Sequence, residues 1–172
     1  MTYSLELDNN SNSTIKMKLY RNVKNVSDLR QKILNRTLDC CIVKPSLIVD
    51  PFQIVIAANK AVVAEKLTTK SIYSEILFNL SISKNITQSL QKFGIEDNER
   101  EILVVVIEKE GTTSNFENVL RQIDGEEVNM LQLKELTNVE EVKKVYKLSD
   151  VEFTHLSVLN SVVSRIAGKE FL

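Results

Sequence analysis

The chain has 172 residues, of which 43% are hydrophobic and 26% charged, a composition ordinary for a soluble globular protein. This length allows a single domain, spanning residues 1–172, to bury a core without disulfide bonds. The longest aliphatic run, residues 102–107, is too short for a membrane helix, which needs roughly 20 residues. We therefore expect no association with a membrane.

Charge is distributed unevenly along the chain, although the net charge is only −1. The first 70 residues contain 11 Lys and Arg and 6 Asp and Glu, whereas the remaining residues contain 11 and 17. This asymmetry indicates either an anionic partner at one end and a basic one at the other, or two oppositely charged surfaces that meet within the fold.

The termini and the cysteines indicate where the protein works. The first six residues lack the basic and apolar regions of a signal peptide. The two cysteines, Cys40 and Cys41, are neighbours in sequence and are poorly placed for an ordinary disulfide. We therefore expect a reducing compartment, either the cytoplasm or the nucleus.

The chain begins with a pattern typical of a β-hairpin. Apolar and polar residues alternate in residues 5–7 and 15–19, and the turn-rich residues 8–13 lie between them. A short helix is predicted next, because Val26, Leu29 and Ile33 recur at helical spacing.

The clearest helix start in the chain is at Asp50. Asp50 is a good N-cap, Pro51 suits the first helical position, and Gln53 completes a capping box. We expect this helix to run to about Leu67. It is apolar almost all the way round, which is typical of a buried helix.

The remaining pattern predicts more helix and one central strand. Helices are expected around residues 72–80, 85–94, 116–123 and 138–146, and a long last helix from about Ser149 to Ala167. Residues 102–107 are continuously apolar and mostly β-branched, as in a strand buried on both faces. The sequence therefore predicts a compact α+β domain with a small antiparallel or mixed sheet, packed by several helices.

Catalytic chemistry is not indicated anywhere. The one histidine, His155, falls within the apolar arc of the last helix, which is more typical of a core or interface residue than of a catalyst. One histidine and two adjacent cysteines do not make a zinc site without carboxylates, and the glycines are too isolated to form a phosphate-binding loop. We expect no enzyme activity, cofactor or metal.

Polar residues in the Asp50 helix define a first candidate surface, made of Asn59, Lys60 and Lys66. In one interpretation Asn59 holds a neighbouring loop while the lysines extend to water. In another, these residues form a basic edge that binds a tRNA phosphate backbone or an exposed nucleotide end. An alternative from a different class is a small-ligand protein or an enzyme with a pocket near Asn59 and Lys60.

The last helix defines a second candidate surface. It has a wide apolar arc, and its polar side carries small residues rather than Lys and Glu, which allows another backbone to approach closely. The alternatives are an ordinary packed terminal helix and a homodimer contact. The residues expected to bind a partner protein are Leu156, Leu159, Val163, Ser157 and Ser161.

Several stretches of the chain resemble the family of PRPK-binding proteins, the small subunits of the KEOPS (EKC) complex. The similarity covers nearly the whole chain in order, and departs from the family mainly in the hairpin loop, the loop before Phe116 and the last helix. The segments that carry it are residues 23–25, 28–30, 48–54 (Ile-Val-Asp-Pro-Phe-Gln-Ile), 57–61 (Ala-Ala-Asn-Lys-Ala), 75–81, 85–86, 92–95 and 142–148.

The resemblance implies a non-catalytic subunit with one direct partner. That partner is a PRPK-type atypical kinase or ATPase, which the family binds through helices that include the last one. The kinase contacts a threonylcarbamoyl transferase subunit, and the complex installs N6-threonylcarbamoyladenosine beside the anticodon of tRNA. Archaeal and fungal relatives also help to recruit tRNA by its single-stranded 3′ end, so the resemblance implies that tRNA is a further partner.

Overall fold

The structure is a computed structural model that describes residues 2–149 and 155–172, with the side chains of the last helix described from Val158 onward. It confirms the predicted α+β class. The described residues form eight α-helices: α1 (Val26–Leu34), α2 (Pro51–Val63), α3 (Ile72–Leu80), α4 (Ile86–Phe93), α5 (Phe116–Leu120), α6 (Leu133–Leu136), α7 (Val139–Tyr146) and α8 (His155–Ala167).

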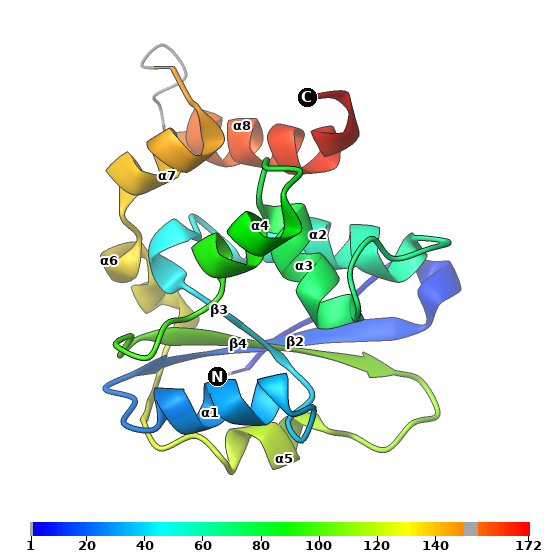
Figure 1. Cartoon of the computed structure of the whole chain (residues 1–172), viewed down its shortest axis with the longest axis vertical. Coiled ribbons are helices and arrows are strands. Elements are labelled where there is room, and N and C mark those ends of the chain that lie inside the picture. Colours follow the sequence, from blue (N-terminus) through cyan, green and yellow to red (C-terminus); the bar gives the residue numbers. More distant parts are fainter. Residues whose placement is uncertain (1, 150–154) are drawn as a thin grey trace.

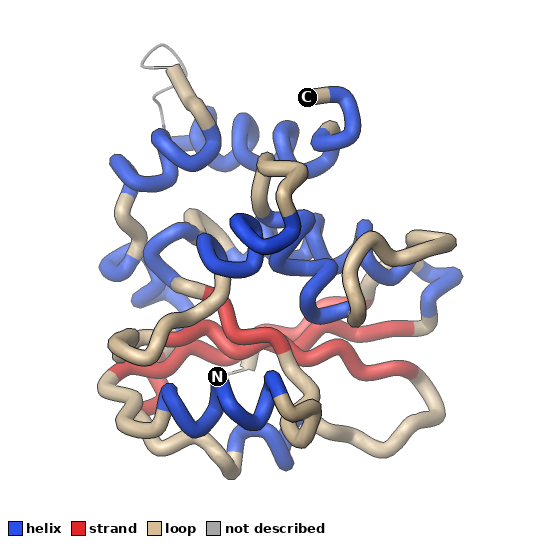
Figure 2. The backbone as a smooth tube through the Cα atoms, in the orientation of Figure 1, coloured by secondary structure: helices blue, strands red, loops and turns tan. Residues whose placement is uncertain are grey.

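A five-stranded sheet lies at the centre of the molecule (Figure 2). Its strands pair in the order β1-β2-β4-β3, and β5 pairs with the end of β2 that β1 leaves free. All the pairings are antiparallel. The strands are β1 (Tyr3–Glu6), β2 (Ser13–Arg21), β3 (Cys41–Val43), β4 (Ile102–Lys109) and β5 (Glu126–Val128).

Helices cover both faces of this sheet, in one layer on one face and in two layers on the other (Figure 1). Helices α1 and α5 lie against one face, and α2, α3 and α4 lie against the other. Beyond this second layer, α7 and α8 form an outermost layer, in which α8 packs on α2. The last helix is therefore an outer element of the molecule, separated from the sheet by another helix.

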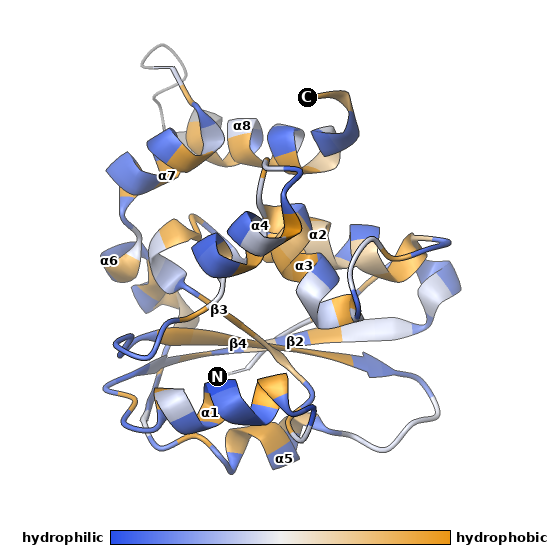
Figure 3. Cartoon of the chain, in the orientation of Figure 1, coloured by the Kyte–Doolittle hydropathy of each residue, from blue (hydrophilic) through white to orange (hydrophobic). Residues whose placement is uncertain are grey.

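Strand alternation divides the apolar side chains between two cores. Ile15, Met17 and Leu19 on β2 point toward α2 and α3, and all three are fully buried. Ile102, Val104 and Val106 on β4 point to the opposite face, where they pack in the core that includes residues of α1 and α5. Figure 3 shows apolar residues on the sheet and on the inward sides of the helices. The prediction that β4 is a central strand, buried on both faces, is confirmed.

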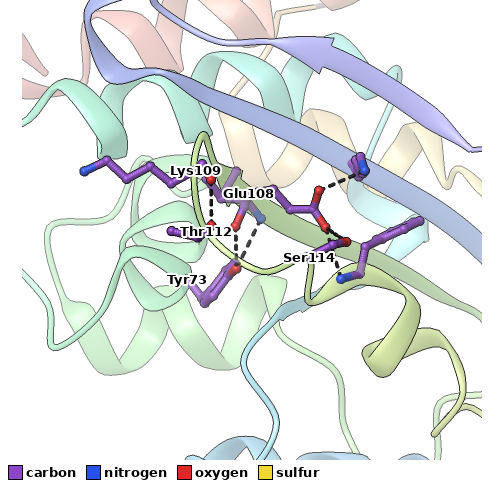
Figure 4. A network of polar contacts seen from close by, with 8 residues as sticks. Tyr73, Glu108, Lys109, Thr112 and Ser114 are labelled. Carbon is purple, nitrogen blue, oxygen red and sulfur yellow. Dashed lines mark hydrogen bonds and ion pairs between the residues drawn. The ribbon is translucent and has the colours of Figure 1, made fainter.

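A tyrosine takes the place of a missing strand at one edge of β4 (Figure 4). Strand β3 reaches only as far as the pairing of Cys41 with Val105, so the next edge groups of β4 lack a strand partner. The Tyr73 hydroxyl accepts a hydrogen bond from the Ile107 N–H (3.1 Å) and donates one to the Ile107 carbonyl (3.4 Å). This contact satisfies a sheet edge that would otherwise be open to pairing with another chain.

Next to it on the strand, Glu108 holds the loop that leads to α5 (Figure 4). Its carboxylate accepts hydrogen bonds from the Ser114 hydroxyl (2.5 Å) and the Phe116 N–H (3.2 Å), and it pairs with Lys16 at 2.8 Å. Burial disfavours the charged form, but these bonds outweigh it and hold the pKa of Glu108 below its usual value. The predicted helix at Phe116 is present, but it ends at Leu120 rather than near Gly125.

The predicted end of the Asp50 helix is also wrong. Helix α2 ends at Val63, not near Leu67, because the following loop turns back to meet Glu75 at the start of α3. The start of the last helix, predicted near Ser149, lies outside the described residues: Ser149 is not helical, residues 150–154 are not described, and the described part of α8 begins at His155. In the described parts of the chain, no helix combines the length and the apolar character needed to span a bilayer.

Candidate functional site

The start of α2 is fastened by a buried polar network. Asp50 caps the helix by accepting a hydrogen bond from the Phe52 N–H (2.9 Å). Gln53 is fully buried: its amide oxygen accepts from the Val49 N–H, and its amide nitrogen donates to the Leu47 carbonyl and the Tyr146 hydroxyl. The predicted Asp50 cap is confirmed, but the predicted capping box is not formed, because the Gln53 side chain caps Val49 and not Asp50.

Tyr146 extends this network from α7 to α3. Its hydroxyl donates to the Leu80 carbonyl (2.6 Å) while accepting from Gln53, so three helices share one buried chain of hydrogen bonds. Burial raises the pKa of Tyr146 far above its usual range, which keeps the hydroxyl protonated as a donor. This buried network of hydrogen bonds holds the helical layers together.

Asn59 has a structural partner. Its side-chain oxygen accepts a hydrogen bond from the Asp8 N–H (2.9 Å), which ties the hairpin loop between β1 and β2 to α2. This contact matches the interpretation in which Asn59 holds a neighbouring loop.

Lys60 is engaged with the end of α8. Its ammonium donates to the Ile166 carbonyl (2.8 Å) and pairs with the Glu170 carboxylate (2.8 Å). The Ile166 carbonyl is among the last four of the helix, which lack a partner within the helix itself. A cation is favourable there as well, because the helix dipole places partial negative charge at this end.

A basic pocket of about 270 Å³ opens beside Lys60. It lies between α2, α3, the loop that joins them and the C-terminal turn. It brings Lys60 and Lys66 together, but Asn59 is not among its lining residues. Its lining consists of four lysines, two glutamates and four other residues: Lys60, Lys66, Lys84, Lys169, Glu75, Glu170, Ala64, Thr68, Phe78 and Asn79.

Lys169 is the buried lysine among the residues that line this pocket, with only 3% of its surface exposed. Its ammonium donates to the Phe78 carbonyl and lies 3.3 Å from the centroid of the Phe78 ring. Burial lowers the pKa of Lys169 to about 8, and the nearby charge of Lys60 acts in the same direction.

Glu75 and Lys66 complete the pocket in different ways. Glu75 is buried and accepts hydrogen bonds from the Thr68 and Thr69 N–H groups (3.1 and 2.9 Å), so its charge is used to shape the loop. Lys66 is exposed and makes no hydrogen bond or ion pair with the part of the chain that the structure describes. Lys66 is therefore free to contact an external anion.

The outer helix presents part of its apolar arc to solvent. Val158, Val162 and Ile166 are buried on the side that meets α2, whereas Leu159 and Val163 are half-buried. Ser161 is also half-buried. The side chains of Leu156 and Ser157, and that of His155, lie outside the described residues.

Leu159 and Val163 share one flank of α8. On the opposite flank, Arg165 donates to the Lys147 carbonyl at the end of α7 (3.3 Å).

On α2, Phe52 and Val63 are 42% and 51% exposed, and helical geometry places them on one strip with the half-buried Ile56. Large apolar side chains exposed at helical spacing are candidates for protein contact.

The two cysteines point to opposite faces of the sheet, and both thiols are free and buried. Burial raises the pKa of Cys40 to about 12 and that of Cys41 well above its usual value. Neither thiol is therefore ionised at neutral pH, as a nucleophile or metal ligand would be. Within the described residues, no group of three or more His, Cys, Asp and Glu side chains is arranged to hold a metal ion.

The chain is a small α+β domain with two features suited to binding another molecule. One is the apolar face formed by α8 and the exposed strip of α2, and the other is the basic pocket. The chain belongs to the kinase binding protein CGI-121 family, whose model matches residues 20–170.

Curated relatives agree with this family. The chain is 35% identical over 160 residues to a Danio rerio protein named EKC/KEOPS complex subunit TPRKB, and the match covers 91% of each chain. It is 33% identical over 140 residues to EKC/KEOPS complex subunit cgi121 of Aspergillus fumigatus, covering 76% of this chain and 74% of the relative. A Schizosaccharomyces pombe protein of the same name is 27% identical over 157 residues, covering 86% of this chain and 90% of the relative.

Sequence reasoning missed two of the four lysines of the basic pocket, Lys84 and Lys169. It singled out Lys60 and Lys66 because both lie in the stretch that begins at Asp50. Lys84 follows α3, and Lys169 and Glu170 follow α8, so the chain is folded back on itself to bring them together. No periodicity or local motif marks these residues.

Proposed function

We propose that this chain is a non-catalytic subunit of a KEOPS (EKC) complex that binds the PRPK-type kinase of that complex. Through the kinase it is connected to the threonylcarbamoyl transferase subunit and supports N6-threonylcarbamoyladenosine modification of tRNA. The observation that carries the proposal is the family match over residues 20–170, together with relatives named as subunits of this complex. The expected sites of action are the cytoplasm and the nucleus.

The proposed kinase interface combines α8 with the exposed strip of α2. Leu159 and Val163 lie one turn apart, which is the spacing of anchors on a helix that enters a groove. A helix of 13 residues is roughly 20 Å long and is too small alone to bury the roughly 1,000 Å² that a specific interface requires. Phe52, Ile56 and Val63 of α2 supply the additional apolar area.

Affinity for the kinase tests this interface. We expect Leu159→Asp and Val163→Asp each to weaken binding by about 30-fold or more, because each places a carboxylate in an apolar contact. Leu34→Asp is the matched control, since Leu34 is 70% exposed on α1, across the sheet. If both variants keep the unfolding midpoint of the wild type and bind the kinase as tightly as it does, α8 is not the interface.

Support for a second role, in tRNA recruitment, comes from the basic pocket. Four lysines line it, Lys66 is unengaged by the described chain, and phosphate contacts from lysine are the usual basis of sequence-independent RNA affinity. The three residues predicted to bind tRNA, Asn59, Lys60 and Lys66, are not equivalent. Lys66 is the member best placed to contact RNA, because Asn59 and Lys60 also hold the fold.

Binding of tRNA at low salt tests the second role. We expect Lys66→Glu and Lys84→Glu to weaken it several-fold, and Lys134→Glu, an exposed lysine on α6, to have little effect. If neither the isolated protein nor its complex with the kinase binds tRNA at low salt, the second role is excluded and the kinase-binding role is unaffected.

The small-ligand or enzyme alternative has less support. It requires an enclosed cavity with convergent polar groups near Asn59 and Lys60. The pocket is open, Asn59 does not line it, and the Lys60 ammonium is bonded to Ile166 and Glu170.

A further inference from the structure

The C-terminal turn, residues 168–172, is fastened to the body of the protein by lysines from three segments. Lys60 of α2 binds Glu170 at 2.8 Å, and Lys84, which follows α3, donates to the Leu172 carbonyl at 2.7 Å. Lys169 of the turn itself inserts toward the Phe78 carbonyl. The turn therefore engages three of the four lysines of the basic pocket.

Glu170 is the exchangeable anion in this pocket. The other glutamate, Glu75, is buried and is bonded to the loop at Thr68 and Thr69. Glu170, by contrast, has a side chain that is 62% exposed, and its carboxylate pairs with Lys60. The hydrogen bond from Lys60 lowers the pKa of Glu170, so it stays ionised at neutral pH. The Glu170 carboxylate thus occupies the Lys60 ammonium, which an incoming phosphate would need.

We propose that Glu170 is an autoinhibitory counter-ion that plugs the basic pocket and that an RNA phosphate displaces it. This inference rests on the proposed role of the pocket in RNA binding. A carboxylate and a phosphate oxygen accept the same hydrogen bonds from lysine, so Glu170 and an RNA phosphate compete for Lys60. This plug, the Glu170 carboxylate paired with Lys60, makes the affinity for RNA lower than it would be if the four lysines of the pocket had no such counter-ion.

The exchange leaves the outer helix in place. Lys60 has three N–H donors, and its bond to the Ile166 carbonyl is separate from the one to Glu170. Beyond Glu170 the turn is loosely covered, since Phe171 and Leu172 are 92% and 59% exposed. Glu170 is therefore able to leave Lys60 while Ile166 stays bound and α8 remains docked on α2.

The test compares Glu170→Gln with Glu135→Gln, which removes the same charge from an exposed pair with Arg21. The probes are a labelled single-stranded RNA oligonucleotide and inorganic pyrophosphate, titrated at low salt. We expect Glu170→Gln to bind both probes about three- to five-fold more tightly than Glu135→Gln and the wild type. The slope of log affinity against log salt for RNA should be the same in the two proteins, because Lys60 contacts a phosphate in both once RNA has displaced Glu170.

The outcomes separate the plug from the RNA role. Tighter binding of pyrophosphate without any binding of RNA supports the plug and removes the RNA role. Equal RNA affinity for Glu170→Gln and Glu135→Gln, with weaker binding by Lys66→Glu, overturns the plug and keeps the RNA role. If Glu170→Gln binds neither probe better than Glu135→Gln does, the plug is likewise overturned.

Discussion

The ammonium nitrogen of Lys60 lies 2.8 Å from the carbonyl oxygen of Ile166, so that α2 holds the far end of α8 through one side chain. The same nitrogen pairs with Glu170 just beyond the helix. Because α8 packs on α2 and stands one layer away from the sheet, this contact helps to fix the helix that we propose as the kinase-binding surface.

Replacement of Lys60 by methionine should therefore destabilise α8. Lys60→Met keeps most of the apolar stem but leaves the Ile166 carbonyl without its partner, so we expect a loss of about 1–3 kcal/mol in the free energy of unfolding. Faster amide hydrogen exchange in residues 158–167 should accompany it. Lys134→Met is the control. A Lys60→Met protein with wild-type exchange in α8 would contradict the importance of this contact.

The buried hydroxyl of Tyr146 should be the most sensitive polar group of the helical layers. Tyr146→Phe leaves the Leu80 carbonyl and one Gln53 N–H unsatisfied in the core, so we expect urea denaturation to show a loss of about 1–3 kcal/mol. Tyr20→Phe makes the same change where the hydroxyl has one longer bond, 3.3 Å to Glu127, and should cost less. Equal losses for the two variants would argue against the network.

The fold was predictable from sequence wherever a local signal decided the structure. Asp50 and Pro51 mark the start of α2, and the β-branched run of β4 marks a strand with neighbours on both sides. Each depends on side-chain chemistry within a few residues. Boundaries set by distant contacts were not predictable. The apolar pattern of α2 continues to Leu67, but Glu75 binds the N–H groups of Thr68 and Thr69, so the chain turns instead.

The candidate site was likewise predictable only where a local signal in the sequence marks the residue. Lys60 and Lys66 stand out in sequence because they interrupt an apolar helix and its continuation. Their relation to Lys169 and Glu170 depends on how α8 docks on α2, which no local pattern encodes. The sequence also left open whether oppositely charged segments meet inside the fold. In the pocket they do, since Lys60 of the basic part binds Glu170 of the acidic part.

Cys40 and Cys41 should be unreactive in the folded protein. Both thiols are buried, and their raised pKa values keep them protonated, so a thiol reagent at neutral pH should modify neither. In denaturing urea both should react. Rapid labelling of either cysteine under native conditions, detected by mass spectrometry, would contradict the burial of the two thiols.

The lowered pKa of Lys169 gives a pH dependence of known sign. Its pKa is about 8 in the folded protein and about 10.4 in an unfolded chain, so between these values the unfolded state binds more protons and stability rises with pH. The cysteines act oppositely above about pH 9, because their pKa values are raised on folding. The contribution of Lys169 is therefore isolated by comparison with Lys169→Met, in which the cysteine contribution is unchanged. The difference in unfolding free energy, wild type minus variant, should increase from about pH 8 to about pH 10 in urea denaturation. A difference that stays constant or falls over this range would show that Lys169 is as easily charged in the folded protein as in water.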